Sequence, residues 1–394
     1  MTEVIVQRKR NFSKYLEGAF GLSEEEIWSD IKKESLINLK TMIEIRLENR
    51  VQEQVGRRWA HDVGRKYYRN GHYVRSLLTS QGFLDIRMPR LRNGKIVFEE
   101  IERYKRRTKE TDQLILNMFL AGISTRRVEE ALRPIIGPKA ISAGLVSQIT
   151  KVLTAEVKNY HTKAIDDRYE YLILDGIYVN SKSPGYKRRR CILVAYGLWK
   201  EKGELRREII DFEMAWKGES ENAWSIFLHK LYHRGLTGKK LRLITIDGNA
   251  GLKNAAENIY PLAKIQKCWA HKLRNVSKRL SKRLGETCVD EASEIYNAKN
   301  YKEAIKAYKR WSKFWRTLSP EAVNCLEEDI DYLLNFFREP KELWKKIRTT
   351  NIIERSFREV RRRIRPMSCF QNTDSVERII FAIFYRLNDV WKKA

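Results

Sequence analysis

The hydrophobic and polar positions of this chain change their period several times, and the first long stretch has the period of a helix. Residues 23–54 carry apolar side chains three and four positions apart and contain no Pro or Gly, which predicts a helix. Residues 66–100 then alternate and contain two Asn-Gly pairs, at 70–71 and 93–94, a strong signal for hairpin turns. We therefore expect an N-terminal helical region over 1–64, followed by a small β-element.

Three short helical patterns follow between residues 111 and 153, and Gly122 and Gly137 mark the breaks between them. Ser124 and Ser142 are suitable caps for the second and third helices, so the spacing suits a helix-turn-helix. A plain three-helix bundle is the alternative, and the net positive charge of the chain favours the helix-turn-helix. We group these helices with the β-element as one region over 65–155.

From residue 169 the pattern becomes that of an α/β domain. Three strands separated by hairpin-length breaks are followed by a helix that Ser220 can cap, and then by a strand, a helix and a short strand. The three strands are predicted at 169–179, 187–199 and 205–216, the first helix at 220–236, and the next strand at 241–247. By analogy, this is the element order of an RNase H-like domain.

The alternation stops at residue 272, and helical patterns continue to residue 347. An all-helical insertion is the simplest account of this stretch. Two further helices are predicted at 352–365 and 375–391. We therefore expect an α/β core over 165–271, a helical insertion over 272–347, and closing helices of the core over 348–394.

Charge indicates the kind of partner. The chain has 78 Lys and Arg against 50 Asp and Glu, a net charge of +28, which favours a polyanion such as nucleic acid. No segment has the roughly 18 consecutive apolar residues of a membrane-spanning helix, and the N-terminus does not resemble a secretion signal. The five cysteines are scattered and odd in number, which argues against a disulfide framework. We expect a cytoplasmic, nucleoid-associated protein that binds no membrane.

Asp175 is the most informative acidic residue. It interrupts an apolar strand on the face that also carries Ile173 and Ile177. An ionised carboxylate in such surroundings costs several kcal/mol unless a cation or hydrogen bonds compensate it. The alternative is an aspartate on an edge strand or in a turn before Gly176, pointing into solvent.

Asp247 ends a predicted strand just before Gly248 and a helix. Aspartate is a favoured N-cap, so capping alone explains its position. In an RNase H-like sheet, however, the first and fourth strands lie side by side, and Asp175 and Asp247 would then face one another. Like charges held that close need a metal ion.

Glu354 stands near the start of the helix predicted at 352–365. Asn351 is a suitable N-cap, and Asn-x-x-Glu imitates a capping box, which is the structural alternative. Arg358, Arg361 and Arg365 share the helical face of Glu354 and suit a phosphate backbone. A solvated face is the alternative for these arginines, although six Arg with one Glu over 355–365 exceed what solubility requires.

These three carboxylates offer only oxygen donors, which suit Mg²⁺ or Mn²⁺ and not zinc. Two such ions about 4 Å apart can activate a water or a 3′-hydroxyl for in-line attack on a phosphodiester. No side-chain nucleophile is then required.

Four sequence blocks, in their order along the chain, resemble the signature blocks of Mutator-type transposases of bacterial insertion sequences. They are "LDGIYV", "TIDGNAGLKNA", "KCWAHKLRN" and "RTTNIIERSFREVRRRIRPM", and "GISTRRVEEAL" and "SAGLVSQIT" are similar to that family's DNA-binding region. The likeness runs from about residue 65 to the end of the chain. It implies a DDE triad of Asp175, Asp247 and Glu354, an RNase H-like fold, and a helical insertion between the second Asp and the Glu.

Cys268 and His271 match the Cys-x-x-His pair of the same family. No second Cys/His pair stands nearby at ligand spacing, which argues against a structural zinc site. We expect His271 near the active site, contacting DNA or orienting a neighbour; a core cysteine and a surface histidine are the alternative. Asn249 occupies a position where the family often has His, so no role is assigned to it.

The resulting hypothesis is a DNA transposase that binds the inverted repeats of its own element and cleaves and joins DNA with two Mg²⁺ or Mn²⁺ ions. Its partners are double-stranded DNA, at the element ends and at the target, and further copies of the chain in a homodimer or higher oligomer. A DNA-binding regulator derived from a transposase and a structure-selective nuclease are the alternatives. The basic residues expected to contact DNA are Arg126, Arg127, Lys272, Arg274, Arg358, Arg361 and Arg365.

Overall fold

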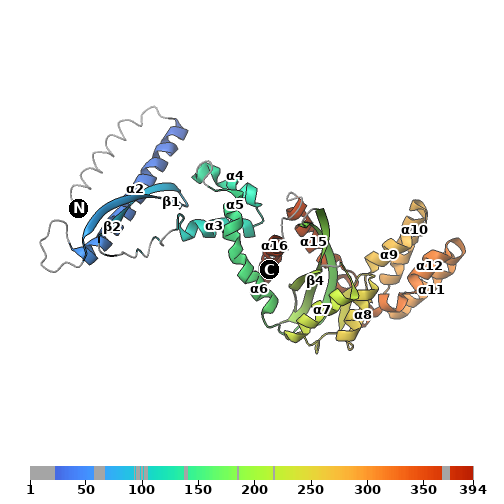
Figure 1. The fold of residues 1–394 in the computed structure, drawn as a ribbon. Helices are drawn as coiled ribbons and strands as arrows, with labels where there is room; N and C mark the ends of the chain where they lie inside the picture. Colours follow the sequence, from blue (N-terminus) through green and yellow to red (C-terminus); the bar gives the residue numbers. More distant parts are fainter. Residues whose placement is uncertain are drawn as a thin grey trace. The chain divides into compact units, whose positions relative to one another are not determined.

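The structure is a computed structural model of the chain, drawn in Figure 1, and it falls into two compact units. The first comprises Met1–Phe119 and Thr125–Ile149, and the second comprises Leu120–Ser124 and Thr150–Ala394. The residues that the structure describes are 23–56, 67–92, 94, 98, 101, 105–136, 141–183, 186–215, 218–365 and 373–393.

The first unit begins with the long helix α2, Glu24–Val55, which confirms the predicted helix. A capping box starts it: Ser23 N donates to Glu26 Oε2 at 2.8 Å, and Ser23 Oγ accepts from Glu26 N at 3.4 Å. The helix packs on a two-stranded antiparallel sheet of β1, Arg69–Thr79, and β2, Gly82–Leu91. The buried core between them contains Leu47, Leu77, Leu84, Ile86, Met88 and Ile101.

The hairpin turn lies elsewhere than predicted. It falls at residues 80–81, where Thr79 Oγ1 donates to the carbonyl of Gly82 at 2.8 Å and accepts from Gln81 N at 3.2 Å. The Asn-Gly pair at 70–71 is instead part of β1, at a register shift that accommodates the positive φ of Gly71, +69°. The prediction of a turn at 70–71 was wrong because a glycine with positive φ is accommodated by a β-bulge as well as by a turn. The second turn was predicted at the Asn-Gly pair 93–94, and Asn93 lies outside the described residues.

Three helices follow, as predicted: α3, Lys109–Leu120, α4, Thr125–Ile136, and α5, Ala143–Ile149. Gly122 lies in the break before α4 with a φ of +93°, while Gly137 lies outside the described residues. Ser142 Oγ accepts from Leu145 N at 3.1 Å, which confirms the predicted cap of the third helix. Whether these helices read DNA as a helix-turn-helix stays a prediction.

The second unit is built on a five-stranded sheet in the order β5-β4-β3-β6-β7. β3 pairs with β4, and β4 with β5, in antiparallel fashion, whereas β6 is parallel to both β3 and β7. The first and fourth strands of the unit therefore lie side by side, as predicted. The strands are β3, Tyr171–Ser183; β4, Tyr186–Glu201; β5, Glu204–Ala215; β6, Leu243–Ile246; and β7, Lys264–Lys267.

Two helices cover one face of this sheet. They are α7, Glu221–His233, which Ser220 caps as predicted, and α8, Ala250–Ile259. Their buried side chains form one core with every second residue of the central strands, including Leu172, Leu174, Ile244 and Ile246. The intervening residues of β3 and β6, Asp175 among them, therefore point to the opposite face.

The chain between β7 and α15 is helical, as predicted for 272–347. Gln266 on β7 ties this region to the sheet, because its side chain donates to Leu333 O at 3.0 Å and accepts from Phe336 N at 2.8 Å. The helices are α9, Trp269–Ser277; α10, Lys282–Tyr296; α11, Tyr301–Leu318; α12, Pro320–Glu327; α13, Ile330–Leu333; and α14, Trp344–Ile347. Short 3₁₀ helices lie at Asn335–Arg338 and Lys341–Leu343, and another, Thr150–Val152, precedes α6, Leu153–Thr162.

Two C-terminal helices close the unit: α15, Asn351–Ile364, and α16, Thr373–Lys393. α16 packs on the edge strand β5, where a bulge leaves Ile210 without a partner on β4. Beside the bulge, the Asn388 side chain accepts from Ile209 N at 2.8 Å and donates to Ile209 O at 2.9 Å. A side-chain amide thus takes the place of a neighbouring strand. Within the described residues, no helix is long and apolar enough to cross a membrane.

We predict that Asn388→Leu lowers the free energy of unfolding of this unit by about 2 kcal/mol, because the buried N–H group of Ile209 loses its acceptor. Chemical denaturation followed by tryptophan fluorescence would measure the change. Asp389→Ala, next to it but exposed and paired only with Lys393, should stay within about 0.5 kcal/mol of the original protein. Equal effects of the two substitutions would contradict the conclusion that the hydrogen bonds of Asn388 to Ile209 stabilise the edge strand β5.

Candidate active site

Asp175 and Asp247 occupy equivalent positions on neighbouring parallel strands. The ladder between β3 and β6 runs from Tyr171 opposite Leu243 to Leu174 opposite Ile246. Asp175 is the next residue of β3, and Asp247 directly follows the last residue of β6. Side chains at equal register on adjacent strands share a face about 5 Å apart. The predicted meeting of the two carboxylates is therefore a direct result of the strand register.

Asp247 does not cap the helix that follows it. Asn249 is the N-cap of α8, since its Oδ1 accepts from Leu252 N at 3.0 Å. Asp247 Oδ1 accepts from Asn249 N, at 2.9 Å, within the turn. The capping alternative for Asp247 is therefore wrong, and Asn249 has a structural role that the sequence did not reveal.

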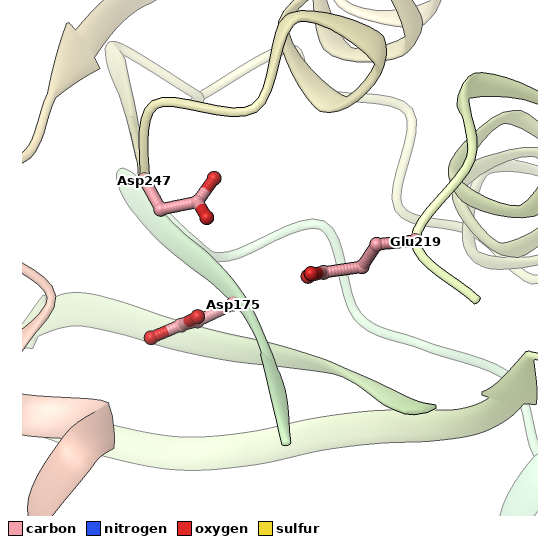
Figure 2. A group of neighbouring side chains, drawn as sticks. All are labelled: Asp175, Glu219 and Asp247. Carbon is pink, nitrogen blue, oxygen red and sulfur yellow. The ribbon is translucent and has the colours of Figure 1, made fainter. Parts of the chain in front are cut away.

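A third acidic residue, Glu219, joins the two aspartates and was not predicted. It precedes α7, and its carboxylate points toward those of Asp175 and Asp247 (Figure 2). A ligand oxygen from each of the three residues lies within 4.8 Å of the others. In the described part of the chain, this is the only group of three or more candidate metal ligands.

Burial and mutual repulsion dominate the electrostatics of this group. Asp175 is only 7% exposed. Its pKa is raised to about 7, first by burial and then by the charge of Asp247, while the charge of His271 acts in the opposite direction. Burial and Asp247 likewise raise the pKa of Glu219 to about 7. The charge of His271 therefore offsets the burial and mutual repulsion of these carboxylates only in part.

Glu354 lies outside the three-carboxylate group. It sits in the first turn of α15, whose N-cap position is Thr350, and no side chain caps this helix. The capping-box alternative for Glu354 is therefore wrong. Its Oε1 lies 3.4 Å from Nε2 of His271, so the predicted neighbour of the active site is in contact with the predicted third acid.

Cys268 and His271 join the start of α9 to the start of α15. Thr350 N donates to Cys268 Sγ at 3.2 Å, and Thr350 Oγ1 lies 3.4 Å from His271 Nδ1. The hydrogen bond with Cys268 raises the pKa of His271 to about 9, and the charge of Asp175 raises it as well. A protonated His271 thus places positive charge between Glu354 and the other acids.

The predicted DNA-contacting residues fall into three groups. Arg358, Arg361 and Arg365 are exposed along α15, and Arg274 is exposed on α9. Arg126 and Arg127 are exposed at the start of α4 in the first unit. Lys272, in contrast, is 9% exposed and pairs with Asp329, which also binds Lys267. Because its side chain is buried and held by this ion pair, we omit Lys272 from the proposed DNA contacts.

The sheet order and the acidic group define an α/β protein with a carboxylate site at the centre of its sheet. A family model described as "Transposase, Mutator family" matches residues 21–394, and the chain belongs to that family. The resemblance found in the sequence blocks is thereby confirmed.

Named relatives agree with this membership. The chain is 33% identical over 357 residues to the transposase for insertion sequence element ISRM5 of Rhizobium meliloti, covering 90% of this chain and 87% of that protein. It is 30% identical over 395 residues to the transposase for insertion sequence element IS256 in transposon Tn4001 of Staphylococcus aureus, covering 94% and 96%. The Drosophila P element transposase strand transfer complex aligns with 76% of the chain at a TM-score of 0.30 and 10% identity, too distant to support an argument.

The raised pKa values predict a specific pH dependence of stability. A carboxyl group whose pKa is higher in the folded than in the unfolded protein stays protonated to a higher pH in the folded state. Deprotonation therefore favours the unfolded state as the pH rises. The metal-free protein should therefore lose stability as the pH rises from about 4 to about 7. Asp175→Asn should reduce this loss by roughly 1–3 kcal/mol.

Denaturation in EDTA at a series of pH values would test this dependence. Asp389→Asn, an exposed acid on α16, is the matched control and should leave the pH profile unchanged. If the stability of Asp175→Asn changed with pH in parallel with that of the original protein, the raised pKa of Asp175 would not be the cause of the loss of stability.

Proposed function

We propose that this protein is a DNA transposase that binds the terminal inverted repeats of its element and catalyses metal-dependent DNA cleavage and strand transfer. The observation that carries the proposal is the pair of carboxylates Asp175 and Asp247, which lie side by side in a chain of the Mutator family. A structural role does not explain why a buried carboxylate on β3 should meet a second carboxylate at the end of β6.

The residues fit a divalent cation. The donors are carboxylate oxygens, the type preferred by Mg²⁺ and Mn²⁺, and their repulsion would be relieved by positive charge. Asp175, Asp247 and Glu354 would hold two such ions, which supply an activated water or 3′-hydroxyl and stabilise the leaving oxygen. The protein supplies the rigid strand register that fixes the two aspartates.

The exposed face of α15 suits the DNA backbone. Arg358 and Arg361 extend from the helix that carries Glu354, and no carboxylate partner is found for either among the described residues. Guanidinium groups there would position a phosphate beside the acids and stabilise charge that develops on it.

The remaining parts have proposed roles that follow the same logic. The strand order of the second unit supports an RNase H-like core, with the helical segment 272–347 inserted between Asp247 and Glu354. The first unit, with Arg126 and Arg127 exposed on α4, would recognise the element ends. Synapsis of two ends would need a dimer or a larger assembly.

Replacing Asp175 or Asp247 by Asn, or Glu354 by Gln, should reduce cleavage and joining by orders of magnitude, because each change removes a metal-binding charge without changing size. Binding of labelled element ends, measured by fluorescence anisotropy, should survive in all three variants. Cleavage without joining in the original protein would indicate a nuclease, and end binding without cleavage would indicate a regulator. Full strand transfer by Glu354→Gln would remove Glu354 from the proposed set.

Arg358→Ala and Arg361→Ala should each reduce cleavage roughly 10- to 100-fold with little change in melting temperature, because exposed arginines add little stability whereas a bound phosphate requires them. Arg362→Ala is the matched control, since Arg362 is exposed on the same helix but pairs with Glu359 at 2.8 Å. A parallel loss of stability and activity at positions 358 and 361 would instead indicate intramolecular ion pairing.

A further inference from the structure

Glu219 lies in a loop, yet three local features fix its backbone. Gly218 before it has a φ of +82°, a conformation that favours glycine. Ser220 after it caps α7, accepting from Ala223 N at 3.2 Å. The Asn249 side chain donates to the carbonyl oxygen of Glu219 at 3.3 Å, which ties the loop to the turn that follows Asp247.

A missing side chain on β3 lets the Glu219 carboxylate reach the aspartates. A Cβ at Gly176 would lie 2.7 Å from Cδ of Glu219, and closer still to its Oε1, inside van der Waals contact. Gly176 follows Asp175 and points to the opposite face, the one that α7 and α8 cover. It lies past the end of the ladder with β6, so the carboxylate passes around the end of that short strand.

The Glu219 carboxylate lies beside the two aspartates, and one of its oxygens has no hydrogen-bond donor among the described residues. Oε1 of Glu219 is buried and accepts no hydrogen bond from any residue that the structure describes. Among the described residues, the buried Asp175 accepts only from the backbone N–H of Gly176, at 2.8 Å. A buried carboxylate oxygen without a donor is costly unless a cation fills the space it faces.

We propose that Glu219 is a further ligand of the divalent cation that Asp175 and Asp247 bind. The inference rests on the proposed function and extends it, because Glu219 adds a third carboxylate beside the two aspartates, in addition to the proposed ligand Glu354. The carboxylate of Glu219 would contribute a negative charge to the cation site. Gly176 leaves space for this carboxylate, and Asn249 holds the backbone of Glu219 in place.

A purely structural role of Glu219 makes a different prediction. If its purpose were only to start α7, its carboxylate could be replaced by an amide, and metal affinity would not change. If it is a ligand, the amide variant loses affinity for the metal although the fold is retained.

The test is titration of the full chain with Mn²⁺ alone, with free Mn²⁺ followed by electron paramagnetic resonance. Glu219→Gln should weaken Mn²⁺ binding by at least about tenfold, since affinity depends on the number of ligand charges. Glu221→Gln is the matched control: it lies two residues away, is exposed, and accepts only from Asn254, at 2.9 Å. Its Mn²⁺ affinity should stay within about twofold of the original.

Gly176→Ala is a second, independent variant, because its methyl group displaces the Glu219 carboxylate while every acid remains in the chain. It should weaken Mn²⁺ binding as Glu219→Gln does. In EDTA, Glu219→Gln should melt no lower than the original protein, because it removes one of three repelling charges.

The outcomes separate this inference from the proposed function. Original affinity in Glu219→Gln and Gly176→Ala, with loss of binding in Asp175→Asn and Asp247→Asn, would overturn the role of Glu219 alone. Original affinity in all four variants would overturn both the inference and the metal site of the proposed function.

Discussion

Repulsion between two carboxylates at equal register is the constraint on which the second unit depends. At about 4 Å, two like charges near a protein surface repel by about 4 kcal/mol, and burial adds to that cost. The sheet sustains it because β3 lies at its centre, bonded on both sides, with Leu172 and Leu174 fully buried under α7 and α8. The register that creates the repulsion also brings together the carboxylates that we propose bind a cation.

The same part of the sheet holds the end of the long helical segment. Thr245, two residues before Asp247, donates to Ile347 O at 2.5 Å, and Trp269 N donates to Arg348 O at 3.1 Å. With the contacts of Thr350 to Cys268, these bonds fix the start of α15 beside the ends of β6 and β7. The position of Glu354 therefore does not depend on the length of the helical segment 272–347. It is fixed by the hydrogen bonds that join residues 347–350 to β6 and to the start of α9.

Much of this unit could be predicted because strand periodicity and cap residues act locally. The alternation around Asp175 and the Ser220 cap were sufficient for the element order, and the order predicted that the first and fourth strands are neighbours. The hairpin of the first unit shows the limit of local signals. A glycine with positive φ serves a bulge as well as a turn, and only the pairing of whole strands distinguishes them.

Glu219 and Lys272 could not be assigned from the sequence, because long-range contacts decide what their charges do. Both are charged residues beside a helix start. Lys272 shares the buried face of α9 with Trp269 and Val276, but this spacing does not identify its partner, and Glu219 belongs to no periodic pattern. Lys272 turns inward and forms an ion pair with Asp329, fifty-seven residues away. Glu219 turns inward to two further negative charges and is not neutralised. A buried charged side chain that has an oppositely charged partner in the chain therefore has a structural role. A buried charged side chain that is held among like charges, as Glu219 is by the space beside Gly176 and the hydrogen bond from Asn249, instead indicates a ligand from outside the chain.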